Sequence, residues 1–228
     1  MVPSNVLQRV LSLRLKDATA TGFAIEIDGQ QYLITARHFL DASPEATIID
    51  VFRNNSWISV PFKRLSVEPI QVDITVLALD RQVVPLMPVD SSGIKGTFLS
   101  QEVFFVGFPL GLMIDGRELN NGFPLPLVKH GILSYFGFTD GDPFLIDGIN
   151  NPGFSGSPVV QCDNPNFPKI IGVISGYRFN QEPVFKNNQQ DTELSVRTNT
   201  GLIIGYDLEY AIRAIKKNPI GFKIESGH

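Results

Sequence analysis

Short segments that alternate between apolar and polar residues recur along this chain and constrain its fold more than any other feature. Segments 10–15 and 22–27 alternate cleanly, which is the period of a strand with one buried face. Asp28 and Gly29 then form a hairpin turn signal before another apolar segment at 31–35. Twenty glycines and sixteen prolines punctuate these segments throughout the 228 residues. The pattern predicts an all-β fold, either a barrel or a sandwich.

The same pattern continues to the end of the chain. Further strands are expected at 47–52, 57–63, 74–79, 102–107, 128–135, 157–161, 170–175 and 202–206. The pattern breaks in the polar, glycine-bearing stretch 90–96, so we place a boundary there between a domain at 1–90 and a domain at 91–228.

The remaining segments are one helix and two long connections. A helix is expected at 208–217, because its apolar residues fall on one stripe and Lys216 and Lys217 suit the negative end of its dipole. The connections are 109–127 and the polar stretch 177–200, and loops of that length are usually functional or mobile. We interpret 177–200 as a solvated loop, with the shaping of a binding cleft as the alternative.

Composition and charge exclude several classes of protein. A hydrophobic fraction of 43% allows a packed core, and a net charge of −4 lacks the basic excess that binds nucleic acid. No apolar run is long enough to span a membrane, and the first residues lack the features of a secretory signal. Cys162 is the single cysteine, which favours a reducing, cytoplasmic setting.

One serine has the surroundings of a nucleophile. Ser155 lies in the sequence Gly153-Phe154-Ser155-Gly156, where the glycines permit a tight turn and a close approach of substrate. The amides of Gly153 and Ser155 could then stabilise an oxyanion. The alternative is an ordinary glycine-rich turn that leads into a strand.

Such a serine needs a general base, and histidine is the usual one. His38 ends an apolar strand, whereas His130 lies inside a strand-like stretch and is interpreted as structural, and His228 is terminal. Asp73 leads directly into the apolar segment 74–79, and a buried aspartate needs partners. Orienting the imidazole would supply one, although a turn residue at a strand start is the alternative.

The three residues together are more specific than any one alone. Their order along the chain is His38, Asp73, Ser155, which is the order in chymotrypsin and differs from subtilisin and the α/β-hydrolases. His38 and Asp73 fall in the first half and Ser155 in the second. A cleft between two barrels would require this division.

The motifs around these residues carry a family resemblance. The segments 35–38, 73–77 and 153–158 resemble those of bacterial trypsin-like peptidases, which are simple relatives of the chymotrypsin and high-temperature-requirement proteases. The resemblance also takes in 107–109, 131–134, 171–176 and 205–207, and so covers most of the chain.

The resemblance implies two six-stranded antiparallel β-barrels, a C-terminal helix and hydrolysis of peptide bonds through an acyl-enzyme, with no metal or organic cofactor. Ser155 would attack, His38 would transfer the proton and Asp73 would orient His38. The amides of Gly153 and Ser155 would hold the oxyanion. Ser175 and Gly176 would pair with the substrate backbone as an added strand.

The sequence departs from the digestive members of that family just before the serine. Phe154 stands where those enzymes have an aspartate that pairs with a newly cut N-terminus, and no activation site resembles theirs. Control is therefore expected from a partner protein, a mobile oxyanion loop or narrow specificity. Ile149 falls at the expected pocket floor and favours an apolar side chain before the cleaved bond, whereas the nearby Asp147 would favour Arg or Lys.

Two other functions remain open. The first is a catalytically silent or partner-activated binding module on the same fold, and the second is an esterase or acyl-transferase that uses the same site. The intact set of three polar residues favours the peptidase, whose partner is a protein or peptide substrate.

Overall fold

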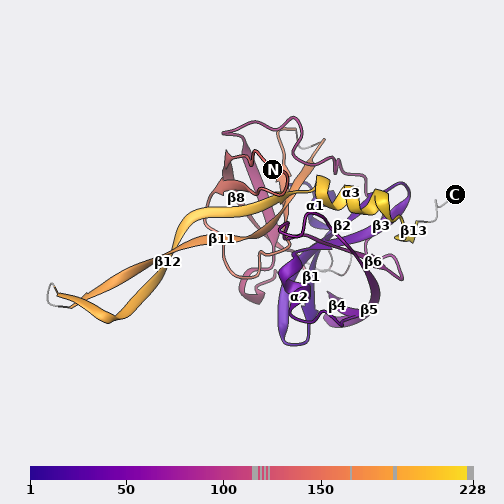
Figure 1. Ribbon diagram of the computed structural model, residues 1–228. Coiled ribbons are helices and arrows are strands. Elements are labelled where there is room, and N and C mark those ends of the chain that lie inside the picture. Colours follow the sequence, from indigo (N-terminus) through magenta and orange to yellow (C-terminus); the bar gives the residue numbers. More distant parts are fainter. Residues whose placement is uncertain are drawn as a thin grey trace.

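The protein consists of two closed, six-stranded antiparallel β-barrels followed by a C-terminal helix (Figure 1). This confirms the predicted all-β, chymotrypsin-like architecture. The computed structural model describes residues 1–114, 118, 120, 122, 124–164, 166–186 and 189–224. No helix in these ranges is long and apolar enough to cross a membrane.

The first barrel is formed by the alternating segments of the N-terminal half. Its strands are β1 (Val10–Leu15), β2 (Ala18–Ile27), β3 (Gln30–Thr35), β4 (Ile48–Arg53), β5 (Ser56–Leu65) and β6 (Thr75–Leu79). β6 pairs with β3 and closes the barrel. The β2–β3 hairpin turns at Asp28 and Gly29, which both have positive φ (49° and 73°), as the sequence predicted. The inward residues, such as Leu13, Leu33 and Leu77, are fully buried.

The second barrel follows the same plan. Its strands are β7 (Glu102–Gly107), β8 (Leu127–Tyr135), β9 (Phe144–Asp147), β10 (Pro158–Gln161), β11 (Lys169–Lys186) and β12 (Gln189–Asp207). They close in the order β10-β11-β12-β9-β8-β7. Its core includes Phe105, Ile146 and Phe154, all fully buried. The sequence did not predict β9, because its residues Phe-Leu-Ile-Asp do not alternate between apolar and polar.

Short elements complete the chain. They are α1 (Ser4–Leu7), α2 (Arg37–Asp41), the 3₁₀ turn η1 (Pro109–Gly111), α3 (Glu209–Lys217) and β13 (Phe222–Lys223). Of these the sequence predicted only α3, whose first residue it placed one position early. β13 pairs with the start of β3, so the C-terminal segment returns to the first barrel.

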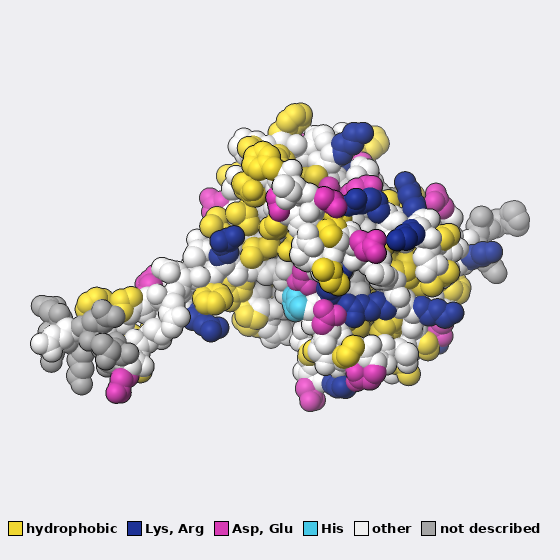
Figure 2. Space-filling model, viewed as in Figure 1, with side chains coloured by type: hydrophobic (Ala, Val, Ile, Leu, Met, Phe, Trp, Pro, Cys, Tyr) yellow, Lys and Arg dark blue, Asp and Glu magenta, His cyan; other side chains and the backbone are white. Residues whose placement is uncertain are grey.

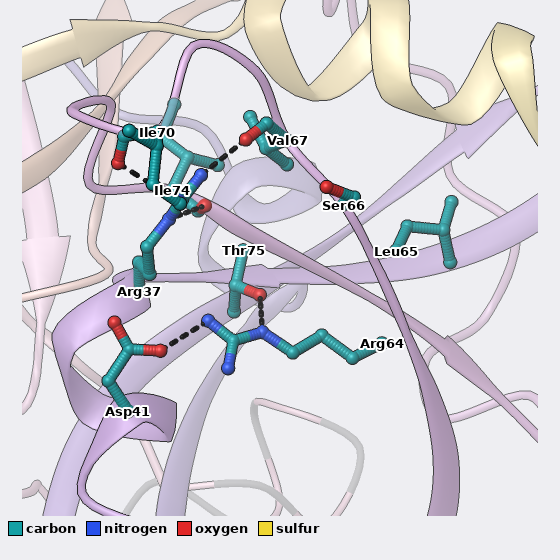
Figure 3. A pocket seen from close by; sticks show the side chains of 9 residues that line it. All are labelled: Arg37, Asp41, Arg64, Leu65, Ser66, Val67, Ile70, Ile74 and Thr75. Carbon is teal, nitrogen blue, oxygen red and sulfur yellow. Dashed lines mark hydrogen bonds and ion pairs between the residues drawn. The ribbon is translucent and has the colours of Figure 1, made fainter. Parts of the chain in front are cut away.

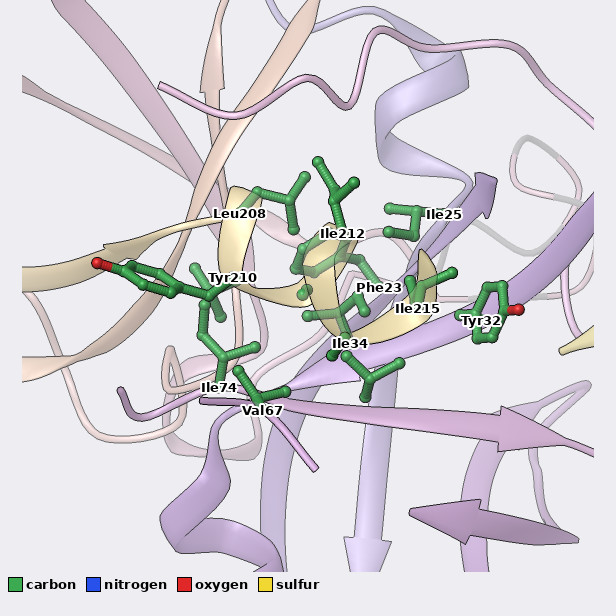
Figure 4. Packing of buried hydrophobic residues seen from close by; sticks show 14 of the residues in the cluster. Phe23, Ile25, Tyr32, Ile34, Val67, Ile74, Leu208, Tyr210, Ile212 and Ile215 are labelled. Carbon is green, nitrogen blue, oxygen red and sulfur yellow. The ribbon is translucent and has the colours of Figure 1, made fainter. Parts of the chain in front are cut away.

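Helix α3 joins the two barrels through a shared core. It directly follows β12 of the second barrel, yet Ile212 and Ile215 belong to the same buried cluster as Phe23 and Ile34 of the first (Figure 4). Val173 of the second barrel belongs to this cluster as well. The helix therefore fixes how the barrels sit against each other.

The prediction for 177–200 is wrong. Instead of a loop, β11 and β12 continue past the barrel as a two-stranded antiparallel ribbon that projects from the body (Figure 1). A ribbon with solvent on both faces has no buried side to demand apolar alternation, so its sequence reads as polar loop.

We expect Ile212→Ala to destabilise the protein by about 2–5 kcal/mol, because the side chain is 5% exposed and its loss leaves a cavity between helix and barrel. Urea denaturation followed by circular dichroism measures this. Lys216→Ala, on the exposed face of the same helix, is the control and should change stability by less than about 0.5 kcal/mol. Equal effects of the two variants would contradict the role given to α3.

Candidate active site

His38 lies in the short helix α2 immediately after β3. The preceding residue, Arg37, is buried and its guanidinium donates to the main-chain carbonyls of Val67, Ile70 (2.9 Å) and Ile74 (3.4 Å) (Figure 3). These carbonyls belong to the loop that leads into β6. Arg37 thus attaches the helix carrying His38 to the loop carrying Asp73.

Asp73 holds His38 by two hydrogen bonds. The backbone N–H of His38 donates to Oδ1 at 2.8 Å, and the imidazole Nδ1 lies 2.6 Å from Oδ2. The hydrogen bond to Asp73 raises the pKa of His38 above its ordinary value of 6.5, against the opposing effect of burial. Burial alone would raise the pKa of Asp73, but the hydrogen bonds that it accepts lower it overall. The pair therefore favours an ionised carboxylate and a more basic imidazole.

Ser175 of the second barrel completes the surroundings of this carboxylate. Its hydroxyl donates to Oδ2 of Asp73 at 2.5 Å. The sequence assigned Ser175 only a role for its backbone, so this bond was missed. Asp73 is consequently held by donors from both barrels.

Ser155 lies on a tight turn before β10 that requires its glycines. Gly153 and Gly156 have positive φ (101° and 85°), and a Cβ at Gly153 would lie 2.7 Å from the carbonyl oxygen of Phe108. The hydroxyl of Ser155 donates to the main-chain carbonyl of Ser175 at 2.9 Å. Among the described residues, no hydrogen bond joins it to His38.

Contacts from the first barrel hold the turn that carries Ser155. Thr21, fully buried in β2, donates from its hydroxyl to the carbonyl of Gly153 (2.8 Å) and from its N–H to the carbonyl of Ser155 (3.1 Å). The N–H groups of Gly153 and Ser155 have no hydrogen-bond acceptor within the part of the chain that the structure describes. The first barrel thereby holds the carbonyl side of the turn and leaves two amides available.

Phe154 packs into the second barrel. Its ring is fully buried and makes an edge contact with Phe105 at 5.1 Å between centroids. Lys129, from β8, has its ammonium 6.0 Å from the Phe154 ring and donates to the carbonyl of Ile149 and to the side chain of Asn151 (3.0 Å). The sequence missed Lys129, since one lysine in an alternating strand is no signal. The buried ring of Phe154, with the ammonium group of Lys129 nearby, therefore lies at the position where the digestive members of the family have an aspartate.

The residues expected at the pocket floor are spread over a bend. Ile149 is 61% exposed, whereas the next residue, Asn150, is 2% exposed and donates to the carbonyl of Gly176 at 3.3 Å. Asn199 of β12 in turn donates to the carbonyl of Asn150 at 2.8 Å. A Cβ at Gly176 would meet no atom within 4 Å, so space is open beside this strand. Asn150 is a second residue that the sequence did not single out.

A cavity of about 360 Å³ lies between helix α2 and the loop before β6 (Figure 3). Arg37 and Arg64 line it, and Arg64 is paired with Asp41 at 2.6 Å. None of His38, Asp73 and Ser155 lines the cavity, so it is separate from the residues of the candidate site. In the described ranges no group of three His, Cys, Asp or Glu side chains could hold a metal ion.

The geometry predicts that His38 titrates above its ordinary value and that Asp73→Asn lowers its pKa, because a carboxylate that stabilises the imidazolium is removed. NMR titration of the imidazole measures both. Asp41→Asn is the control, since Asp41 acts on His38 only through its charge and should cause a smaller decrease. An unchanged pKa in Asp73→Asn would contradict the pairing.

Comparison with known proteins agrees with this geometry. A family model described as trypsin-like peptidase domain matches residues 20–166, which is more than half of the chain. No curated protein matches the sequence.

Solved structures share the fold at low sequence identity. Two crystal structures of Rv3671c from M. tuberculosis H37Rv, both of an inactive form and one a serine-to-alanine mutant, have TM-scores of 0.56 and 0.57 and identities of 14% and 15%. Each alignment covers 93% of this chain, and 87% and 89% of the Rv3671c chains. The serine endoprotease from Yersinia pestis has a TM-score of 0.59 and 19% identity over 93% of this chain, which spans only 63% of that protein. The resemblance inferred from the motifs is thus confirmed: the chain belongs to the family of trypsin-like peptidase domains.

Proposed function

We propose that His38, Asp73 and Ser155 are the catalytic triad and that the enzyme cleaves peptide bonds inside polypeptides through an acyl-enzyme. The observation that carries the proposal is the double hydrogen bond by which Asp73 holds the backbone and Nδ1 of His38. This leaves the other ring nitrogen, Nε2, as the base. Ser155 lies one hydrogen bond from the same network, because Ser175 contacts both Ser155 and Asp73.

The reaction begins with a change of partner for Ser155. Its hydroxyl turns from the carbonyl of Ser175 to Nε2 of His38 and attacks the substrate carbonyl carbon, while His38 takes the proton. Asp73 stabilises the resulting imidazolium, and the amides of Gly153 and Ser155 bind the oxyanion. His38 then gives its proton to the departing amine. Water, deprotonated by His38, hydrolyses the ester and restores Ser155.

The bond between Ser155 and Ser175 gives substrate a role in starting this reaction. A substrate N–H that donates to the carbonyl of Ser175 competes with the Ser155 hydroxyl for the same acceptor. Binding would therefore free the hydroxyl for His38. A newly cut N-terminus is not needed to hold the residue before Ser155 in place, because the ring of Phe154 packs against Phe105.

We propose an apolar side chain before the cleaved bond. Ile149 is 61% exposed and the space beside Gly176 is open, which favours an apolar contact. Asp147 is exposed as well and remains the alternative contact, for Arg or Lys.

The second candidate is a catalytically silent or partner-activated module, and one observation favours it. Ser155 donates to Ser175 while no hydrogen bond to His38 is described, which is the arrangement of a resting site. Control by a regulatory protein would act on this arrangement.

The cytoplasmic setting also remains a proposal, and it rests on Cys162 being the single cysteine.

A fluorophosphonate probe tests whether the serine is activated. We expect covalent labelling of the wild type, because His38 makes Ser155 nucleophilic, and none of Ser155→Ala. Gel fluorescence and mass spectrometry of the labelled peptide measure this, with heat-denatured wild type as the control. A folded wild-type protein that is not labelled would contradict an activated Ser155 and would favour the silent or partner-activated module.

Thr21 provides a test of the oxyanion amides. Thr21→Val keeps the shape but loses the hydroxyl that holds the Gly153 carbonyl, so we expect kcat on β-casein to fall about tenfold to a hundredfold as the turn shifts. Thr21→Ser keeps the hydroxyl and is the matched control, with kcat within about threefold of wild type. A kcat near that of wild type in Thr21→Val would contradict the role of the hydrogen bond, and a loss confined to Thr21→Ser would assign the effect to packing of the methyl group.

A further inference from the structure

Lys129 is a lysine on the inward face of a barrel strand, a position that the catalytic residues leave unexplained. It lies on β8 directly opposite Phe105 of β7, and residues directly opposite in paired strands share a face of the sheet. Phe105 is fully buried, and so is Leu133, an even number of residues further along β8. The side chain of Lys129 therefore starts from the core side of the second barrel.

The cation of Lys129 also differs from those on the surface. Many Lys and Arg side chains of the surface lie beside Asp or Glu (Figure 2). Burial lowers the pKa of the Lys129 ammonium, and no carboxylate in the described part of the chain counters this effect. Taking a cation out of water without an opposite charge costs free energy, so the contacts that it does make are expected to matter.

The lysine ammonium binds the loop before Ser155, which we define as residues 149–153. It donates to the carbonyl of Ile149 and to the side chain of Asn151, the latter at 3.0 Å. The same ammonium lies 6.0 Å from the centre of the Phe154 ring, at the outer limit of a cation–π contact. One side chain therefore contacts both the first half of the loop and the residue that precedes the nucleophile.

The loop is held through its carbonyl groups, and this sets the direction of its amides. Every main-chain carbonyl from residue 149 to residue 155 accepts a hydrogen bond, and the donors are, in chain order of the carbonyls, Lys129, Asn199, Phe154, Leu110, the Thr21 hydroxyl, Ser157 and the Thr21 amide. In a trans peptide the carbonyl and the following N–H point in opposite directions. Holding the carbonyls of Pro152 and Phe154 therefore fixes the direction of the N–H groups of Gly153 and Ser155.

Lys129 is the charged donor of this set. Hydrogen bonds from a charged donor are roughly twice as strong as neutral ones. Its ammonium holds oxygens on both sides of Asn150, so its loss would release the first half of the loop. Pro152 follows Asn151 directly and has a fixed φ, so a displacement of Asn151 is passed on to Gly153.

We propose that Lys129 is a positioning residue, whose ammonium holds the loop before Ser155 in the conformation that presents the amides of Gly153 and Ser155 to the oxyanion. The proposal rests on the proposed function and deepens it, because it names a contact within the chain that orders these amides. The rate of the chemical step, rather than the affinity for substrate, then depends on Lys129, because oxyanion donors act in the transition state.

Kinetics of substituted proteins test this role. Lys129→Met keeps most of the side-chain length but removes the donors and the charge, so we expect kcat on β-casein to fall about tenfold to a hundredfold with KM within about threefold. Lys129→Arg keeps a cation with donors and should restore kcat to within about fivefold of wild type. Lys169→Met is the matched control, because Lys169 is a half-buried lysine of the same barrel that donates to the carbonyl of Lys95. Its kcat should stay within about twofold of wild type.

NMR of the unreacted protein tests the positioning without requiring catalysis. In protein isotopically labelled at glycine and serine nitrogen, Lys129→Met should move or broaden the amide signals of Gly153 and Ser155, while the signal of Gly29 in the first barrel stays in place. Circular dichroism checks that the variant is folded. If it is not, Lys129→Gln, which keeps one donor without the charge, replaces it with the same expected change in the signals.

Three results would overturn the proposal. The first is a kcat near wild type in Lys129→Met with unmoved signals of Gly153 and Ser155. The second is an increase in KM alone, which assigns Lys129 to substrate binding, and the third is an equal loss in the Met and Arg variants, which assigns the effect to the fit of the side chain. Fluorophosphonate labelling of the wild type reports on the triad separately, so absent labelling together with moved amide signals would refute the proposed catalysis alone.

Discussion

The carboxylate of Asp73 is the point on which the site depends. A partly buried carboxylate is costly unless donors surround it, and here the donors come from both barrels: two from His38 in α2 and one from Ser175 in β11. Neither barrel alone could satisfy it. The requirement therefore fixes the cleft as well as the imidazole, and α3 and Thr21 hold the barrels at the separation that makes these contacts.

Much of the fold could be predicted from sequence because its signals are local. Alternation predicted most strands of both barrels, and Asp28 and Gly29 predicted the hairpin whose positive φ angles the structure contains. His38, Asp73 and Ser155 stood out as residue types in a specific order. Their predicted roles require contacts between segments that are distant in the sequence. The structure contains two of these contacts, one between His38 and Asp73 and one between Ser155 and Ser175.

The residues that sequence reasoning missed act only through such distant contacts. Thr21 is an ordinary threonine in a strand until its hydroxyl meets the carbonyl of Gly153, and Lys129 is an ordinary lysine until its ammonium meets the loop before Ser155. Ser175 was assigned a role for its backbone, while its hydroxyl turned out to contact Asp73. The two-stranded ribbon of β11 and β12 was predicted to be a loop because no buried face forces its residues to alternate.

Recognition and activation converge on one acceptor, the carbonyl of Ser175. At rest it accepts the hydroxyl of Ser155, and under the proposed function it also accepts an N–H of the substrate backbone. Under that proposal, substrate contacts away from the cleaved bond also supply binding energy, and part of this energy displaces Ser155 toward His38. A short ligand makes fewer of these contacts and competes less well for Ser175. Under the proposed function, selection of extended substrates and suppression of idle reactivity both depend on this one hydrogen bond.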